Sequence, residues 1–280
     1  MRIGGALFHE YSTPEEWAQV VKRHGYSAAF CPAIADDGDE DAVEAWEDAA
    51  AAMDIVIAEV GAWGNNPISP EEQTRQAGIE GCCRKLALAD NIGALCCVNV
   101  AGSRGDGWAA PHDDNLTQDT FALIVESVRE IIDTVRPVRA FYTLETMPWM
   151  YPDSAQSYAA LLAAIDRKHF AVHLDPVNLV NCPERYYNSG AMLRECFKLL
   201  GPHIVSCHAK DTILRDELTL HLSECRPGAG NLDYRTFIGE VGRLGDDVPV
   251  MIEHLKDPQD YRVAAAFIRN IAQSEDVTVV

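Results

Sequence analysis

Four side chains that are able to bind a metal ion stand at the ends of four consecutive apolar runs. The runs "FYTLE", "VHLD", "VSCH" and "VMIE" end on Glu145, Asp175, His208 and Glu253, respectively. Three carboxylates and one imidazole form an oxygen-rich set of ligands, which favours Mn²⁺ and allows Mg²⁺, Co²⁺, Fe²⁺ or Zn²⁺. Each residue alone is equally typical of a helix cap or a core position, but four in matching positions predict a site for one divalent cation.

Two glutamates beside one cation are suited to proton transfer at a carbon atom. A divalent ion that binds a carbonyl and the adjacent hydroxyl makes the neighbouring C–H acidic and stabilises the enediolate that forms when the proton leaves. One of Glu145 and Glu253 can remove that proton, and the other can return it. The residue types therefore suit metal-assisted proton transfer, with these two glutamates as the candidate catalytic residues.

The elements that carry these residues follow a repeated pattern. Short apolar, β-branched runs alternate with longer amphipathic segments along the whole chain, as in successive βα units. Strands are expected within residues 2–8, 27–33, 54–62, 94–102, 139–145, 169–175, 203–209 and 248–254. Helices are expected at 13–23, from 69 onward, and at 117–135, 154–166, 189–200, 233–244 and 260–272.

Eight such units favour a closed (β/α)₈ barrel, the TIM barrel, as a single domain over residues 1–280. An open doubly wound sheet usually has fewer strands and a glycine-rich first turn, and "GALFHEYSTPEE" is not such a turn. In a (β/α)₈ barrel, the loops after the C-terminal ends of the strands form the active site. The barrel is therefore expected to bring the four strand-end residues together.

Composition and charge exclude several classes of partner. The formal net charge of −20 repels phosphate backbones and anionic lipid, so neither nucleic acid nor a membrane is expected as a partner. No apolar run reaches the length of a membrane helix, and the N-terminus does not resemble a secretory signal. The nine cysteines include two adjacent pairs, a spacing that favours reduced thiols over a disulfide framework. We expect a cytoplasmic protein.

Two further motifs connect the strand-end residues with a known family. "CHAKD" (207–211) contains the predicted metal-binding histidine, and "RPGAGNLDY" (226–234) precedes the last strand. Together with the strand-end residues, these motifs resemble the xylose isomerase-like TIM barrel superfamily of sugar phosphate isomerases and epimerases over nearly the whole chain. The resemblance implies that the four residues bind one divalent metal ion and that the substrate is a sugar, an inosose or a small hydroxy-ketone. In ketose 3-epimerase-like members, glutamates that match Glu145 and Glu253 face opposite sides of the substrate carbon.

Five residues are candidates for contacts with the substrate. Asn178 stands where ketose 3-epimerases generally have a substrate-binding histidine, three residues after the metal-binding aspartate. Arg226 offers a planar donor group for a hydroxyl or a phosphate, although those enzymes place their arginine closer to the metal-binding histidine. Glu59 ends the third expected strand, Trp149 offers a ring for stacking on a sugar, and His221 lies near the expected rim. A surface ion pair for Arg226 and core positions for Glu59 and Trp149 are the alternatives.

Three more residues are candidates for orienting the metal ligands. Lys210 and Asp211 follow His208 in "HAKD", and such neighbours often hold a metal-binding histidine or a bound water in place. His173 lies two residues before Asp175, so the two side chains can point to the same face of the strand. A purely structural role is the alternative for all three.

Other functions share parts of this pattern. The same proton abstraction can end in elimination, as in a dehydratase-like lyase or the catalytic subunit of a C-glycoside deglycosidase that acts on a 3-oxo sugar. Asn178 suits that alternative, in which His221 would be the acid or base. Endonuclease IV-like DNA repair enzymes share the barrel, but they need additional histidines and a positive surface. A sugar-binding protein without activity would not need two basic glutamates. A homo-oligomer or a small partner subunit is compatible with the enzymatic alternatives.

Overall fold

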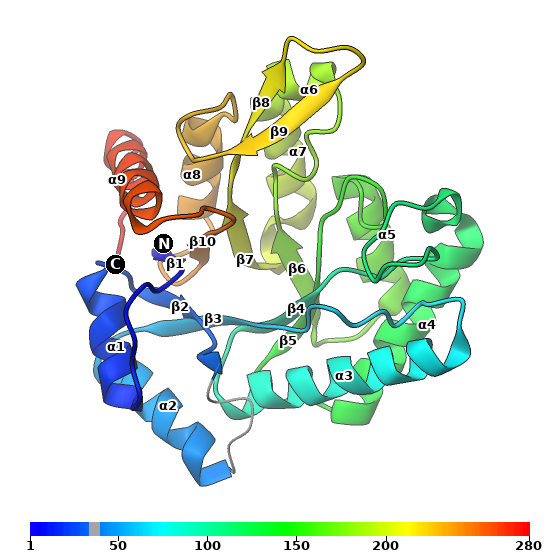
Figure 1. Cartoon of the computed structure of the whole chain (residues 1–280), viewed down its shortest axis with the longest axis horizontal. Coiled ribbons are helices and arrows are strands. Elements are labelled where there is room, and N and C mark those ends of the chain that lie inside the picture. The colour runs from blue at the N-terminus through cyan, green and yellow to red at the C-terminus, as the bar shows by residue number, and fades with distance from the viewer. Residues whose placement is uncertain (34–39) are drawn as a thin grey trace.

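Eight parallel strands form one sheet that curls into a nearly closed barrel (Figure 1). The computed structural model of the chain describes residues 1–33 and 40–280. The strands of the barrel are β1 (Arg2–Gly5), β2 (Ala28–Phe30), β3 (Val56–Gly61), β4 (Cys96–Asn99), β5 (Phe141–Glu145), β6 (Phe170–Leu174), β7 (Ile204–Ala209) and β10 (Pro249–Ile252). Their order is β1–β10–β7–β6–β5–β4–β3–β2. At the seam, the Ser27 amide donates to the Ile3 carbonyl over 3.1 Å, so β2 approaches β1.

Helices surround this barrel, as Figure 1 shows. They are α1 (Pro14–Arg23), α2 (Glu40–Ala52), α3 (Glu72–Asn91), α4 (Gln118–Val135), α5 (Ala155–Ile165), the short α6 (Pro183–Tyr187), α7 (Ser189–Leu200), α8 (Tyr234–Gly242) and α9 (Pro258–Ser274), with 3₁₀ turns η2 (Asp113–Leu116) and η3 (Gly201–His203). The predicted (β/α)₈ barrel is therefore confirmed. No helix among the described residues is long and apolar enough to cross a membrane.

Local signals explain where the helices begin. At α1, the Thr13 side chain accepts the amide of Glu16 and so caps the helix. The helix expected from Ser69 begins instead at Glu72, because the carboxylate of Glu71 accepts the first amides. Helix α9 is longer than expected, since Asp257 caps it and Pro258 occupies its first turn.

Burial on both faces of the sheet produces the core. β6 reads FAVHL and all five of its residues are buried, as expected for a parallel strand between a barrel interior and a layer of helices. Helix α4 buries Ile124, Val128 and Ile131, which lie three or four residues apart and so share one face of the helix. The polar residues inside this apolar barrel therefore require partners, and these partners lie at the centre described below.

One element was not predicted from the sequence. The segment between β7 and α8 contains an antiparallel hairpin of β8 (Asp211–Arg215) and β9 (His221–Cys225), which projects from the barrel in Figure 1. We expected only rim segments there, because the two strands are short and lie outside the βα repeat. The hairpin carries several residues that border the candidate site.

Candidate metal centre

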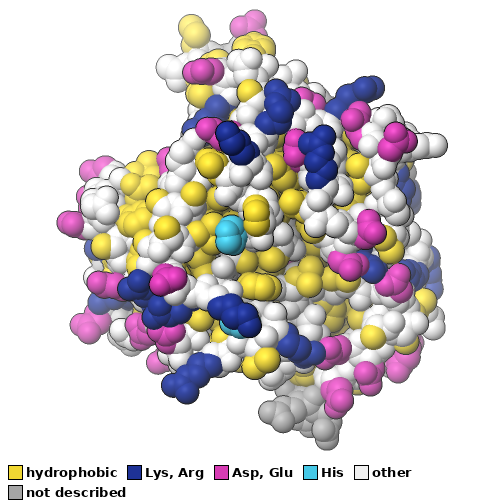
Figure 2. All heavy atoms as spheres, turned by 180° about the vertical axis from the view of Figure 1, so that it is seen from behind, with side chains coloured by type: hydrophobic (Ala, Val, Ile, Leu, Met, Phe, Trp, Pro, Cys, Tyr) yellow, Lys and Arg dark blue, Asp and Glu magenta, His cyan; other side chains and the backbone are white. Residues whose placement is uncertain are grey.

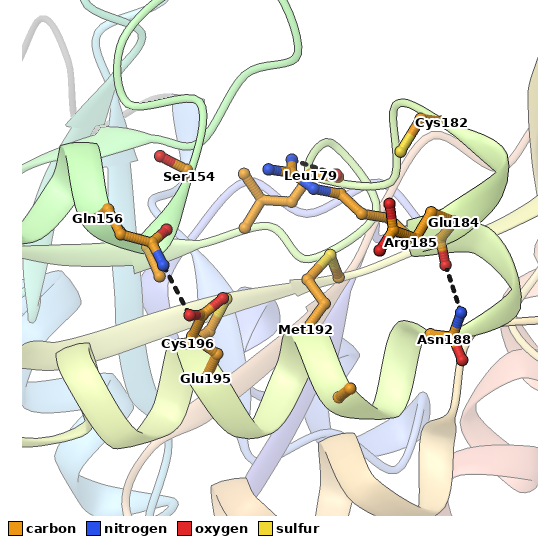
Figure 3. A pocket seen from close by; sticks show the side chains of 12 residues that line it. Ser154, Gln156, Leu179, Cys182, Glu184, Arg185, Asn188, Met192, Glu195 and Cys196 are labelled. Carbon is orange, nitrogen blue, oxygen red and sulfur yellow. Dashed lines mark hydrogen bonds between the residues drawn. The ribbon is translucent and has the colours of Figure 1, made fainter.

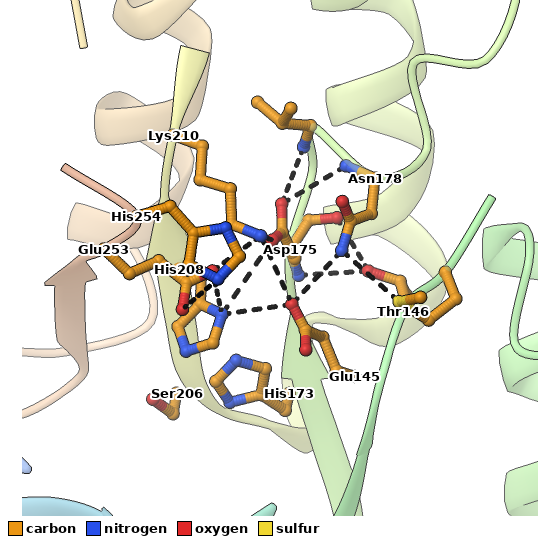
Figure 4. Close-up of polar contacts among 12 residues, drawn as sticks. Glu145, Thr146, His173, Asp175, Asn178, Ser206, His208, Lys210, Glu253 and His254 are labelled. Atoms are coloured by element: carbon orange, nitrogen blue, oxygen red, sulfur yellow. Dashed lines mark hydrogen bonds and ion pairs between the residues drawn. The ribbon is translucent and has the colours of Figure 1, made fainter. Parts of the chain in front are cut away.

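The four strand-end residues converge at the C-terminal end of the barrel (Figure 4). Each offers one ligand atom, and these four atoms all lie within 4.8 Å of one another. Nδ1 of His208 lies 2.9 Å from Oε1 of Glu253 and 3.2 Å from Oε1 of Glu145. The same nitrogen lies 3.8 Å from Oδ2 of Asp175. The supporting strands β5, β6, β7 and β10 are consecutive neighbours, so the cluster occupies one arc of the barrel mouth.

Asp175 serves both the backbone and the cluster. Its Oδ1 accepts the amides of Val177 and Asn178 at 2.9 and 3.3 Å and so fixes the turn after β6. Thr146 holds the Asp175 backbone, because its hydroxyl donates to the carbonyl at 2.6 Å and accepts the amide at 3.1 Å. Oδ2 remains directed at His208 and the cluster (Figure 4). The turn-capping and metal-binding roles are thus compatible at this residue.

The donor atoms fit a divalent cation. Oδ2 of Asp175 and Oε1 of Glu253 are buried and face positively charged neighbours: the Lys210 ammonium lies 2.8 and 2.6 Å from them, and Nδ1 of His208 lies 3.8 and 2.9 Å from them. Buried carboxylate oxygens need a cationic or hydrogen-bonding partner, because desolvation without one is costly. Carboxylates with one imidazole are ligands that Mn²⁺, Mg²⁺ and related ions accept. The buried cluster is therefore consistent with divalent metal binding.

Lys210 brings a positive charge into the same cluster. Its ammonium lies 2.6 Å from Glu253 and 2.8 Å from Asp175, with Glu224 and Glu145 at 3.4 and 3.6 Å. The lysine side chain is only 3% exposed, so these carboxylates stabilise a charge that burial would otherwise disfavour. Lys210 therefore faces the predicted metal ligands directly rather than supporting His208 from behind.

A second polar layer lies beneath the cluster, inside the barrel. Nε2 of His208 lies 3.1 Å from Oε1 of Glu59, which is 2% exposed. The Ser206 hydroxyl donates to Oε2 of Glu59 at 3.1 Å, and Nδ1 of His173 lies 3.5 Å from the same oxygen. The rings of His173 and His208 meet edge to face at 4.1 Å. Glu59 thus holds the side of the His208 ring that points away from the cluster, a common arrangement for metal-binding histidines.

Burial and charge act in opposite directions on the pKa values of the cluster. Burial raises the pKa of Glu145 to about 7, against the influence of His208. Burial also tends to raise the pKa of Glu253, but His208 and Lys210 outweigh it and lower this pKa to about 2. Burial lowers the pKa of His208, yet Glu253, Glu59 and Glu145 raise it well above its ordinary value. The centre therefore stabilises positive charge.

The cluster opens into a cavity of about 370 Å³, which we call the reaction pocket. Its polar residues are Glu145, Asn178, Lys210, Glu224, Glu253 and His254. Its other wall is apolar and consists of Trp63, Val100, Trp108, Ala109, Met147, Pro148 and Trp149. Three partly exposed indoles beside a few convergent polar groups are typical of a small-molecule site.

Comparison with known proteins identifies the family. A family model described as "Xylose isomerase-like TIM barrel" matches residues 18–271. The chain belongs to this family. No curated protein matches its sequence.

Solved structures share the fold of this xylose isomerase-like barrel at low sequence identity. D-psicose 3-epimerase from Clostridium cellulolyticum H10 with D-tagatose is 15% identical, with coverage of 97% of this chain and 99% of that chain and a TM-score of 0.70. 3-keto-D-glucoside 4-epimerase from E. coli is 16% identical, with coverage of 96% and 99% and a TM-score of 0.69. Endonuclease IV from Thermus thermophilus is 13% identical, with coverage of 98% and 100% and a TM-score of 0.72. These identities establish the fold alone.

Several residues predicted from the sequence lie at the centre of this family member. Asn178 lines the reaction pocket, and its amide donates to Oε1 of Glu145 at 3.1 Å. Trp149 also lines the pocket, with its indole N–H donating to the Ala109 carbonyl at 3.0 Å. His173 is fully buried beside Glu59 and His208, in a position to orient them.

Four predicted residues occupy other positions. Glu59 lies below the cluster and does not line the reaction pocket, so it is placed to hold His208 rather than a substrate. The Asp211 carboxylate accepts backbone amides of the hairpin and of the glycine turn after it, and so supports the loop rather than His208. Arg226 forms an ion pair with Asp260 at 3.2 Å, and His221 is exposed on β9. Neither lines the pocket.

His254 is one of the pocket residues that were not predicted from the sequence. It follows Glu253 directly, so strand alternation would point it away from the cluster. Its positive φ of 58° turns the chain at the strand end, and its Nδ1 meets Oε2 of Glu224 at 2.9 Å. A positive φ at a residue other than glycine is uncommon, and no sequence pattern predicts it here.

A larger cavity of about 440 Å³ lies outside the barrel between the loop after β6 and helices α5 to α7 (Figure 3). Its polar groups pair with one another, as Gln156 donates to Glu195 at 2.7 Å and Asn188 to the Glu184 carbonyl at 3.0 Å. Arg185 donates to the Leu179 carbonyl at 3.0 Å. Acid and base groups do not converge on a common point here, as they do at the reaction pocket.

Proposed function

We propose that the chain is a divalent-metal-dependent isomerase or epimerase of a sugar, inosose or small hydroxy-ketone. One observation carries this proposal: Glu145 and Glu253 reach the same pocket from the two ends of the four-strand arc, with Asp175 and His208 between them. These four residues would hold the cation, Mn²⁺ by our first choice. A bound divalent ion supplies a Lewis acid that polarises a carbonyl group.

The chain's own residues provide the proton transfer. Glu145 and Glu253 are the two carboxylates that line the pocket at the cluster, and one removes a proton from carbon while the other returns one. The Asn178 amide holds Glu145 at 3.1 Å, which keeps its carboxylate oriented. Trp63, Trp108 and Trp149 form an apolar wall opposite, which limits water near the reacting carbon.

Two of the structural neighbours support this class of reaction. Their names describe a D-psicose 3-epimerase and a 3-keto-D-glucoside 4-epimerase, which are both sugar epimerases. The same proton abstraction would also begin an elimination, so a lyase that acts on a 3-oxo sugar is the alternative outcome at this site. Analysis of the product separates the two, because elimination removes a substituent and epimerisation does not.

DNA repair fits the centre less well, although endonuclease IV shares the fold. On the face seen in Figure 2, lysine and arginine side chains are mixed with aspartate and glutamate around a hydrophobic middle. The net charge of −20 also opposes binding to a phosphate backbone. Asn178 further occupies the position at which the resemblance leads us to expect a histidine.

The proposal is tested by metal analysis followed by solvent exchange. Purified protein loaded with Mn²⁺ and dialysed should retain about one ion per chain, as one cluster of four ligands implies. In D₂O it should then incorporate deuterium next to the carbonyl of one member of a panel of ketoses, inososes and 3-keto-glucosides. Incorporation at an equal rate after chelation of the metal would contradict the proposal.

A further inference from the structure

The reaction pocket continues into a second cavity beneath the β8–β9 hairpin. This hairpin cleft has a volume of about 400 Å³ and shares four residues with the reaction pocket, namely Pro148, Trp149, Asn178 and Glu224. Asn178 and Glu224 contact the metal cluster through Glu145 and Lys210, respectively. A molecule that reacts at the cluster can therefore extend into the cleft without leaving the protein surface.

The cleft is lined mainly by apolar side chains. Val177 and Val180 come from the loop after β6, and Leu220 and Leu222 come from the hairpin. Trp149 is 39% exposed and Leu220 is 42% exposed, which leaves large apolar surfaces open at the edge of a catalytic pocket. Such surfaces usually mark a place where an apolar ligand group or a partner binds.

Several polar groups of the cleft are engaged already: Glu224 pairs with Lys210 and His254, whereas Asn181 is exposed at the edge of the cleft. The Trp149 indole N–H donates to the Ala109 carbonyl, the Thr212 hydroxyl donates to the Ser223 carbonyl at 3.4 Å, and the Asn178 amide donates to Glu145. A second polyhydroxylated sugar ring would lose water here with few partners to replace it. A planar apolar group would lose few hydrogen bonds to water and would bury the exposed ring of Trp149.

We propose that the substrate is a keto-sugar with an apolar, planar substituent, whose sugar lies in the reaction pocket and whose substituent lies in the hairpin cleft against Trp149. This inference rests on the proposed function, because it places the reacting sugar at the metal cluster. Continuity with the reaction pocket favours a substituent of the substrate over a second copy of the chain as the occupant.

The direct test compares two substrates that differ only in the substituent. Methyl and phenyl 3-keto-β-D-glucopyranosides are offered to the Mn²⁺-loaded protein in D₂O, and deuterium incorporation is followed. We expect kcat/KM to be about tenfold higher for the phenyl compound, mainly through a lower KM, since burial of a ring contributes to binding of both ground and transition states. Equal kcat/KM values would overturn the inference and leave the proposed function standing.

Two matched variants of the hairpin locate the effect. Leu220→Asn removes an apolar wall of the cleft and should abolish most of the preference for the phenyl compound. Leu218→Asn makes the same change two residues away, outside the cleft, and should retain the preference. If Leu220→Asn retains it as well, the phenyl group binds elsewhere and the inference fails.

Two further measurements separate the remaining outcomes. If neither keto-glucoside exchanges deuterium, the proposed function fails for this substrate class. Calorimetry with phenyl and methyl β-D-glucopyranosides then tests separately whether the cleft binds an apolar substituent. Tighter phenyl binding that is lost in Leu220→Asn supports an apolar subsite, and equal binding overturns it. Sedimentation of both variants tests whether a second copy of the chain occupies the cleft. If the wild type is an oligomer that dissociates in Leu220→Asn but not in Leu218→Asn, the inference is overturned.

Discussion

The ring of His208 contacts carboxylates through both of its nitrogens, and this decides which nitrogen faces a cation. Nε2 lies 3.1 Å from Glu59 beneath the cluster, whereas Nδ1 lies among the strand-end carboxylates. A ring that donates its Nε2 proton to Glu59 presents the lone pair of Nδ1 to the metal site. Glu59 therefore acts through His208, although it does not reach the reaction pocket.

The first prediction concerns this support. Glu59→Gln weakens the acceptor for the Nε2 proton, because a neutral amide replaces a carboxylate, and should lower the affinity for Mn²⁺ by about 10- to 100-fold. Titration calorimetry with Mn²⁺ measures the change without requiring a substrate. Glu217→Gln, an exposed glutamate near the hairpin turn, is the control and should bind Mn²⁺ normally. Wild-type affinity in Glu59→Gln would show that Glu59 does not orient the histidine.

Among the secondary-structure elements, the hairpin and the glycine turn after it complete the mouth of the barrel. Asp211 holds them, since its carboxylate accepts the amides of Thr212, Gly228, Gly230 and Leu232 at 2.8 to 3.0 Å. A side chain at Gly230 would collide with this carboxylate, which explains a glycine at that position. The hairpin, with Leu220 and Glu224 on it, thus depends on one buried acid for its position.

The second prediction follows from these four hydrogen bonds. Asp211→Ala leaves several amides without an acceptor and should lower the free energy of unfolding by about 3 kcal/mol, since each unpaired buried group costs about 1–3 kcal/mol. Urea unfolding followed by circular dichroism measures the loss. Asp216→Ala, at an exposed position of the same hairpin, should change stability little. Equal stability of both variants would refute the role of Asp211.

The strands were predictable from the sequence because each pairs an apolar run with a following helix signal. The hairpin was not, since its two short strands pair only with each other and lie outside that repeat. The position of a side chain along the barrel axis was also not predictable. Alternation indicates that Glu59 points into the barrel, but the stagger of the strands determines that it lies below the cluster. Asn178 and Trp149 were accessible to sequence reasoning because they lie in the loops that follow β6 and β5, four residues after each strand ends.

At the scale of the whole molecule, the two halves of the barrel mouth supply different chemistry. β5, β6, β7 and β10 carry the four proposed metal ligands, while the loops after β3 and β4 contribute Trp63 and Trp108 to the apolar wall. Closure of the sheet is what places these groups around one pocket, since their positions are far apart in the sequence. The central claim is that the two glutamates at the ends of the metal-binding arc move a proton at carbon.

The most direct test measures deuterium incorporation from D₂O into a keto-sugar by Glu145→Gln and Glu253→Gln at saturating Mn²⁺, with the metal content of each sample matched. Each variant should exchange about 10²- to 10⁴-fold more slowly than the wild type, because an amide cannot act as a general base. Glu184→Gln, an exposed glutamate at the outer cavity, is the control and should exchange at the wild-type rate. Full exchange by either catalytic variant at equal metal content would contradict the account.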